Sequence, residues 1–508
     1  MRRSDPPARD EQPTELPQRP RLVFLVLLGS GLCGIGLCGA CAAPASRDVV
    51  TRAGDGSTLE PSPLDPRGAA PVEAVSPSAP APPATPVAPG PPAEDDGSGW
   101  LPPIHGQLFS RFRLRDNGDE SDYELYEILS LDVGDPASDL VTGRFMGRAT
   151  FDLDGGGDQD FYELPDTYDG AVTGQLYYLY ADYHGSELLP TARLGRQQIA
   201  DTPEIVSFDG ARLATRPLGD LGVEVGAYGG VPVHFYESSP SGDSVFGTWV
   251  EARPWKGGRA RADWMHLEDE QRLGSFDDDL LGLELWQEIE RRLFLEASYS
   301  RLESNDRDVR AAARWSDPDS AFMLQASYYE LLEPLQQLVN ELDPYYQTLL
   351  TYYPYRQLGL LASQGLGEAA HLQAGLDLRR VSDEEDVGEF NRDYDRAFGA
   401  LALHQLFGSG FELSLSGDWW DSDDQDISGL GFELGHDLGT SLDLALGSYY
   451  SLYKYDLFLV SEREDVRCWY LRGRWKRTQN RTLELTYEYE DADFEDYHTL
   501  RVEAAWRF

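Results

Sequence analysis

The sequence predicts an all-β protein, an antiparallel transmembrane β-barrel of about 22 strands (range 18–24) whose termini both lie on the periplasmic side. Two observations lead to this fold class. Residues 104–508 form short segments in which apolar and polar side chains alternate, and Gly, Asp, Asn or Pro separate the segments. Before them lies an N-terminal segment that has the features of a secretory signal.

Composition supports a β fold and excludes several classes of function. The chain has 50 Gly, 27 Tyr and 11 Trp but only four Met, which favours an aromatic-rich β protein over a helical one. Its net charge of −45 argues against a nucleic-acid partner, because phosphate binding needs clustered Lys and Arg. Three of the four Cys lie in the N-terminal apolar segment, which argues against a disulfide framework.

The first 103 residues are expected to comprise a secretion signal followed by a linker. Arg19 and Arg21 precede an apolar run that ends near Leu37, and Ala40-Cys41-Ala42 fits a cleavage site, so residues 1–42 are predicted to be a signal peptide. A permanent membrane anchor and a lipid on Cys41 are the alternatives. Residues 43–103, with twelve Pro between Pro61 and Pro92, predict a disordered periplasmic linker.

The two-residue period is clearest in the last strand of the barrel predicted over 104–508. Leu500, Val502, Ala504, Trp506 and Phe508 share one face, and charged residues occupy the other. A soluble sandwich would turn such an apolar face into a core, whereas a barrel turns it toward lipid. The signal segment and the aromatic strand ends favour the barrel, because only a closed barrel satisfies every strand edge in a bilayer.

The number of strands follows from the connections. Nine tight turns are predicted, at 134–136, 185–186, 219–220, 256–258, 317–319, 365–367, 408–410, 439–440 and 478–480. They join ten hairpins and account for twenty strands, with longer acidic connections between them, such as 152–171, 266–279, 381–393 and 419–427. Residues 333–355 form either one long external loop or the further hairpin that makes about 22 strands.

Several short segments resemble known outer-membrane proteins. The terminal alternation from Leu500 to Phe508 resembles the insertion signal of bacterial outer-membrane barrels, with Trp506 and Phe508 as its aromatic residues. Residues 194–197 (Leu-Gly-Arg-Gln) and 208–210 (Phe-Asp-Gly) resemble a paired-strand signature of porin-like and alginate-export-type barrels. Residues 132–136, 142–145 and 152–155 resemble porin-like proteins of deltaproteobacterial type. The resemblance implies an outer-membrane barrel, and some such relatives are suspected partners of multihaem cytochromes.

Strand alternation predicts which charged residues line the pore. The predicted lumenal residues are Arg144, Arg148, Arg259, Arg261, Arg310, Arg314, Asp377, Arg472, Arg474, Glu484 and Glu488. Opposed rings of charge create a transverse field that sorts solutes, although ordinary solvated polarity explains the pattern equally well.

Two smaller groups are candidate sites. Arg196, Gln197 and Asp209 predict either a pore constriction, if a bulge turns Arg196 inward, or a cross-strand pair that fixes the register. Asp152, Asp154, Asp158, Asp160 and Glu163 have the spacing of a calcium loop, but Gly156 replaces a ligand and the flanks are not helical. An external calcium-stabilised loop and a plain acidic loop therefore both remain open.

The sequence predicts no enzyme, because the eight His are scattered and no GxSxG, HExxH or P-loop occurs. The predicted function is passive diffusion of small hydrophilic solutes or ions across the outer membrane of a diderm bacterium. The alternatives are the barrel sheath of a trans-envelope conduit, for electron transfer or polymer export, and a structural surface protein. Expected partners are outer-membrane lipid, lipopolysaccharide and the barrel-assembly machinery, with a periplasmic multihaem cytochrome in the conduit alternative. No cofactor is expected apart from the calcium alternative.

Overall fold

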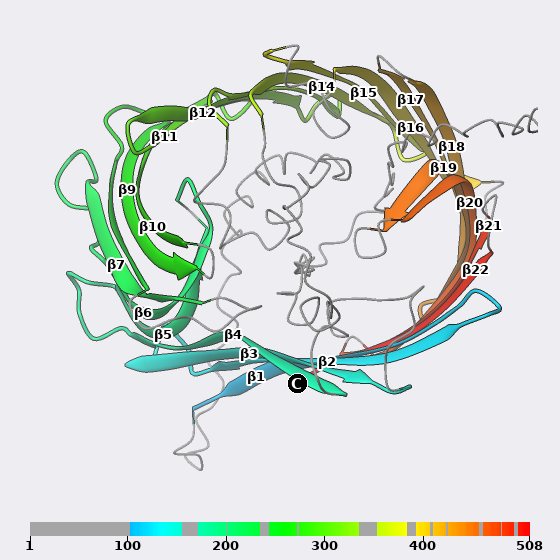
Figure 1. Cartoon of the computed structure of the whole chain (residues 1–508), viewed down its shortest axis with the longest axis horizontal. Coiled ribbons are helices and arrows are strands. Elements are labelled where there is room, and N and C mark those ends of the chain that lie inside the picture. The colour runs from blue at the N-terminus through cyan, green and yellow to red at the C-terminus, as the bar shows by residue number, and fades with distance from the viewer. Residues whose placement is uncertain are drawn as a thin grey trace, which may run out of the picture.

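The computed structural model shows one closed antiparallel β-barrel of 22 strands (Figure 1). It describes residues 102–154, 171–200, 202–233, 243–271, 274–334, 353–383, 393–406, 410–422, 425–456, 461–478, 480–491 and 496–508. The predicted signal peptide and most of the predicted linker therefore lie outside the described residues. None of the described residues forms a helix long and apolar enough to cross a membrane.

The strands follow one another around the barrel. Their bounds are β1 Ile104–Asp116, β2 Ser121–Val133, β3 Val141–Asp152, β4 Val172–Tyr183, β5 Thr191–Ile199, β6 Val206–Ala214, β7 Glu224–Pro232, β8 Ser244–Ala252, β9 Gly258–Gln271, β10 Gly274–Ile289, β11 Leu293–Leu302, β12 Asn305–Asp317, β13 Phe322–Leu331, β14 Tyr355–Leu366, β15 Ala370–Val381, β16 Tyr394–Leu406, β17 Phe411–Ser422, β18 Gln425–Leu438, β19 Leu442–Asp456, β20 Ser461–Thr478, β21 Arg481–Asp491 and β22 Tyr497–Arg507. Each strand pairs with the next in antiparallel register, and β22 pairs with β1.

The two ends of the barrel sequence meet where the ring closes. Gly106 N donates to Phe508 O at 2.8 Å, and Phe508 N donates to Gly106 O at 3.0 Å. The C-terminus consequently lies beside β1 (Figure 1). Because the strand number is even, β1 starts and β22 ends at the same end of the barrel. We call this end, which also carries the β2–β3 turn, the turn end, and the opposite one the loop end.

The predicted strand count is confirmed, and of the two alternatives for residues 333–355 the structure agrees with a single connection rather than a further hairpin. Residues 332–354 connect β13 directly to β14. The missing turn is at residues 290–292, between β10 and β11. Glu290 and Arg291 adopt positive φ there, at 52° and 60°, although neither is Gly, Asn or Asp. The turn escaped prediction because it lacks the residue types that normally mark one.

Two predicted acidic loops are also wrong. Residues 266–279 belong mostly to β9 and β10, and residues 419–427 belong mostly to β17 and β18. The ladders run to Gln271↔Gly274 and Ser422↔Gln425, so each connection is only two residues long. The acidic residues interrupt the apolar alternation that marks a lipid-facing strand, and the sequence therefore predicted loops. Strands can still pair there, because water solvates the acidic side chains.

The two faces of the wall differ as predicted. On β10, Leu281, Leu283 and Leu285 are exposed, whereas Leu280 on the alternate face is buried. On β15, Leu372 and Leu376 are exposed, and Asp377 shares the opposite face with Arg379. The exposed leucines form the outer face of the barrel, and the alternate positions face the lumen.

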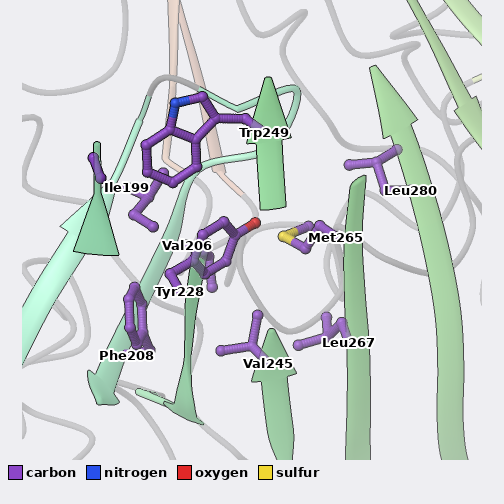
Figure 2. Close-up of a cluster of buried hydrophobic side chains, with 10 residues drawn as sticks. Ile199, Val206, Phe208, Tyr228, Val245, Trp249, Met265, Leu267 and Leu280 are labelled. Carbon is purple, nitrogen blue, oxygen red and sulfur yellow. The ribbon is translucent and has the colours of Figure 1, made fainter. Parts of the chain in front are cut away.

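One stretch of the lumenal face carries an apolar core. It comprises Ile199, Val206, Phe208, Ala214, Tyr228, Val245, Trp249, Met265, Leu267 and Leu280, from β5 to β10. Figure 2 shows that side chains from β5 and β6 face those from β9 and β10, with Tyr228 and Trp249 between them. Phe208 has no exposed surface, so this part of the inner wall is packed and dry. The sequence did not predict this core.

Candidate functional site

The structure places the predicted lumenal residues on one face of the wall. Cross-strand register joins Arg144 to Tyr180, Arg310 to Tyr329, Asp377 to Arg396 and Arg474 to Glu484, always at positions that alternate with the outer apolar face. The same parity holds for the remaining predicted lumenal residues, which are Arg148, Arg259, Arg261, Arg314, Arg472 and Glu488. Their role in permeation stays a prediction.

Most of the predicted lumenal arginines lie against carboxylates. The ion pairs join Arg261 to Asp263 at 2.7 Å, Arg310 to Asp308 at 3.1 Å, Arg472 to Glu433 at 3.0 Å, Arg474 to Glu484 at 2.5 Å, Arg259 to Glu251 at 3.7 Å and Arg144 to Asp132 at 3.8 Å. Each pair cancels most of its own long-range field. Among the described residues, Arg148 and Arg314 have aromatic rather than acidic neighbours, Tyr126 and Phe294.

A further group of charge pairs joins β1 to its two neighbours, β22 and β2. Arg111 pairs with Glu503 at 2.6 Å, and Arg115 pairs with Asp122 at 2.6 Å. Arg113 pairs with Glu124, whose side chain is buried. The sequence analysis missed these residues, although Arg111, Arg113 and Arg115 alternate along β1 and could have been identified by their period.

Arg396 lies at the centre of another group of lumenal charges. Its guanidinium makes hydrogen bonds of 2.6 to 3.1 Å with the Asp418 carboxylate and one of 3.5 Å with Asp377. It also lies 4.7 Å from the Trp420 ring centroid. Predicted residue Asp377 therefore belongs to a three-strand cluster, but sequence reasoning missed Arg396 because no local motif marks it.

The β5–β6 connection extends over the lumenal face to distant strands. Glu204 pairs with Arg307 at the start of β12 at 2.5 Å, and both side chains are largely buried. Pro203 packs on β10, where a Cβ on Gly282 would lie 2.1 Å from Pro203 Cγ. This connection thus covers the loop-end side of the apolar core and projects into the barrel interior.

Arg196, Gln197 and Asp209 do not form one cluster. Arg196 is directly opposite Asp209, and its guanidinium makes two hydrogen bonds to that carboxylate, at 2.7 and 2.6 Å. Both residues share the outer face with exposed Leu194. Gln197 lies on the lumenal face and is fully buried. The β5–β6 ladder continues through Arg196 without a bulge, so the inward rotation required for a constriction is absent.

The predicted calcium loop is only partly described. Asp158, Asp160 and Glu163 lie outside the described residues. Asp154 accepts a hydrogen bond from Tyr123 N at 3.0 Å, just beyond the end of β3. Burial, a hydrogen bond with Asp152 and the negative charge of Asp122 raise the pKa of Asp154 to about 6. No group of three or more metal-ligating side chains occurs among the described residues, and calcium binding stays a prediction.

The terminal aromatic residues are exposed at the turn end. The ring centroids of Trp506 and Phe508 are 5.3 Å apart, and both rings are accessible on the outer face. A Cβ on Gly106 would lie 2.6 Å from the Phe508 ring, so β1 accommodates the last residue closely. The role of these residues in membrane insertion stays a prediction.

Comparisons with known proteins find only distant similarities. No protein-family model matches the chain, and no curated protein matches its sequence. Among solved structures, OpdK from Pseudomonas aeruginosa with vanillate is 12% identical and has a TM-score of 0.40, covering 81% of this chain and 100% of OpdK. OccAB2 from Acinetobacter baumannii is 10% identical and has a TM-score of 0.39, and the match covers 80% of this chain and 98% of the OccAB2 chain.

The copper transporter OprC has a TM-score of 0.44, with 12% identity and 81% coverage of both chains. Likenesses at this level carry no argument about what the present barrel transports. They also leave the resemblance to deltaproteobacterial and alginate-export-type proteins unconfirmed. The proposals below rest on the geometry of the barrel.

Proposed function

We propose that this protein is an outer-membrane channel through which small hydrophilic solutes or ions diffuse passively. The observation that supports this most directly is the division of the wall into an exposed apolar outer face and a charged lumenal face within one closed ring. In a bilayer such a ring satisfies every backbone edge and encloses a polar path. Bacterial barrels of this kind belong to the outer membrane, and the turn end is then periplasmic.

The paired arrangement of lumenal charges favours a general channel over a specific binding site. Arg472–Glu433, Arg474–Glu484 and Arg501–Glu488 offer both signs of charge next to each other. A permeating ion meets local dipoles rather than a single strong field. Small neutral and charged solutes should therefore both pass.

Single-channel recording tests this proposal. Purified protein inserted into planar bilayers should give stepwise KCl conductance that stays open without a ligand. A correctly folded, heat-modifiable barrel that never conducts would contradict the channel and favour a sheath or structural role. A matched test uses protein that lacks residues 1–103. If that segment plugs the barrel, its removal should produce a conductance that the full-length protein lacks.

A further inference from the structure

The turn between β20 and β21 brings two exposed arginines together at the turn end of the barrel (Figure 1). Arg481 lies directly opposite Trp506 in the β21–β22 ladder, and its Cζ lies 5.4 Å from the Trp506 ring centroid. Since Trp506 is exposed on the outer face, Arg481 belongs to that face too. Arg477 is the extra residue of an irregularity between Lys476 and Thr478, and Thr478 is paired with Arg481. The two arginines are therefore close neighbours at one turn.

Exposed apolar side chains lie beside these arginines on the outer face. Trp475, Trp506 and Phe508 are exposed by 44%, 46% and 45%. Leu483 is exposed as well and lies opposite Trp475 in the β20–β21 ladder. Aromatic side chains of membrane barrels gather at the level of the lipid headgroups, because their rings suit a boundary between hydrocarbon and water. The outer face thus combines an apolar surface with positive charge at its edge.

Neither Arg477 nor Arg481 forms an ion pair with a carboxylate in the part of the chain that the structure describes. The acidic side chains near this end of β19, β21 and β22 belong to the lumenal face and have partners there. These ion pairs are Asp443–Lys476, Glu484–Arg474 and Glu503–Arg111. The terminal residue Phe508 accepts a hydrogen bond from Gly106 N through its O atom at 2.8 Å. The two arginines therefore keep their positive charge for an external anion.

Other arginines at the turn end are placed differently. Arg292 lies 3.2 Å from Asp317 and 2.9 Å from Asp319. Arg253 lies 3.9 Å from Glu251, whose side chain is on the lumenal face. In a chain with 88 acidic and 43 basic residues, a neighbouring carboxylate is the ordinary environment of an arginine. Two adjacent arginines without one are a distinctive feature of the β20–β21 turn.

We infer that this surface binds the headgroup of an anionic phospholipid, with Arg477 and Arg481 on the phosphate and the acyl chains along Trp475 and Leu483. The inference rests on the proposed location of the barrel in a bilayer, in which the turn end lies at the periplasmic leaflet. Guanidinium groups bind phosphate through paired N–H donors. A lipid with a net negative charge is favoured over a zwitterionic one, whose ammonium group opposes the attraction to the arginines.

Native mass spectrometry of the full chain in detergent tests the site by titration with phosphatidylglycerol and with phosphatidylcholine of the same acyl chains. The wild-type protein should bind phosphatidylglycerol more tightly. Arg481→Gln should weaken this binding about fivefold, and Arg477→Gln/Arg481→Gln about 30-fold, with little change for phosphatidylcholine. Arg477→Lys/Arg481→Lys keeps both charges and should retain most of the preference.

The matched control is Arg253→Gln/Arg292→Gln, which removes the same charge from the same end of the barrel. It should bind phosphatidylglycerol as the wild type does. Equal affinity of the wild type for the two lipids, unchanged binding in Arg477→Gln/Arg481→Gln, or an equal loss in the control would overturn the site. Heat-modifiable migration shows that each variant is folded. KCl conductance should be the same in all variants, and its absence from the wild type would reject the channel proposal, whereas the titration would still decide the lipid site.

Discussion

At the residue scale, the sequence predicts which face a side chain occupies better than it predicts its partner. The predicted lumenal arginines all share the face opposite the exposed apolar side chains, because a strand has a fixed period of two, and their lining of a pore stays a prediction. The partners depend on register between strands, and sequence separations as large as that of Arg111 and Glu503 leave no local signal. Of the two alternatives for Arg196 and Asp209, the structure shows a cross-strand pair on the outer face, and the bulge that a constriction would require is absent.

Asp154 should make the β3–β4 connection sensitive to pH. Its pKa is raised to about 6, so the folded state binds a proton more tightly than the unfolded chain does. Protonation therefore stabilises the folded position of Asp154 at the end of β3, and this contribution is lost as the pH rises through about 6. Limited proteolysis between β3 and β4 should accordingly be slower at pH 5 than at pH 7.

Asp154→Asn should remove this pH dependence, since the amide stays neutral throughout. If the predicted calcium loop exists, Ca²⁺ should protect the wild-type connection at pH 7 and protect it less at pH 5, because protons and calcium compete for the carboxylates. Equal cleavage rates at both pH values in the wild-type protein would argue against a raised Asp154 pKa.

Glu204→Gln should destabilise the barrel because it removes the carboxylate that forms an ion pair with the buried Arg307 guanidinium. Breaking one partner of a buried ion pair costs about 3–5 kcal/mol. The double variant Glu204→Gln/Arg307→Gln should recover part of this loss, because the isolated charge is then gone. Urea unfolding followed by tryptophan fluorescence measures both. A single variant as stable as the wild type would show that the β5–β6 connection is not anchored by this pair.

At the element scale, the sequence predicts strands well and unusual turns poorly. Turns with Gly, such as the one at Gly439, were found because Gly adopts positive φ without strain. The turn at 290–292 was missed because Glu and Arg occupy positions that favour other residues. The acidic ends of β9, β10, β17 and β18 were taken for loops, because the alternation there lacks an apolar face. The alignment of Gly195, Gly210 and Gly230 on β5, β6 and β7 was not predicted, because it depends on register across three strands.

Replacing Glu290-Arg291 with Asn-Gly should stabilise the β10–β11 hairpin. Left-handed backbone conformation costs about 1–2 kcal/mol for an ordinary residue, and Asn-Gly is the preferred pair for such a turn. Gly439→Ala provides the opposite change, because Gly439 has a φ of +72° and no atom within 4 Å of the new Cβ. Urea midpoints should rise for the first variant and fall for the second. A fall in both would indicate that Glu290 or Arg291 makes a stabilising contact.

At the scale of the whole molecule, we expect membrane insertion to depend on the last strand. The Phe508 backbone forms two hydrogen bonds with Gly106 of β1, and its ring is exposed beside Trp506. Phe508→Asp places a charge on the outer face and should prevent accumulation of heat-modifiable protein in the membrane fraction. Phe508→Tyr keeps an aromatic ring and should assemble normally. Normal assembly of Phe508→Asp would refute the proposed insertion signal.

Ion selectivity is also a property of the whole barrel, and two sets of charge oppose each other in it. The chain carries a net charge of −45, and Asp383, Asp421 and Asp426, which belong to the acidic runs 383–386 and 421–426 of the sequence, lie toward the loop end. Most predicted lumenal arginines are held by carboxylates, so they contribute little net positive field to the pore. The acidic runs should therefore dominate and concentrate cations near the mouth.

Screening limits how far this preference extends. The Debye length is about 30 Å at 0.01 M salt and about 8 Å at physiological salt, so a wide mouth should be selective only at low ionic strength. We expect a modest cation preference in reversal-potential measurements across a KCl gradient, fading as the salt concentration rises. Replacing the four Asp of residues 421–426 with Asn should reduce the cation preference without closing the pore. Of these four, only Asp421 has a described side chain. Replacing the same four with Glu should preserve the preference. Strong anion selectivity would instead mean that Arg148 and Arg314, which have aromatic neighbours, control permeation from within the lumen.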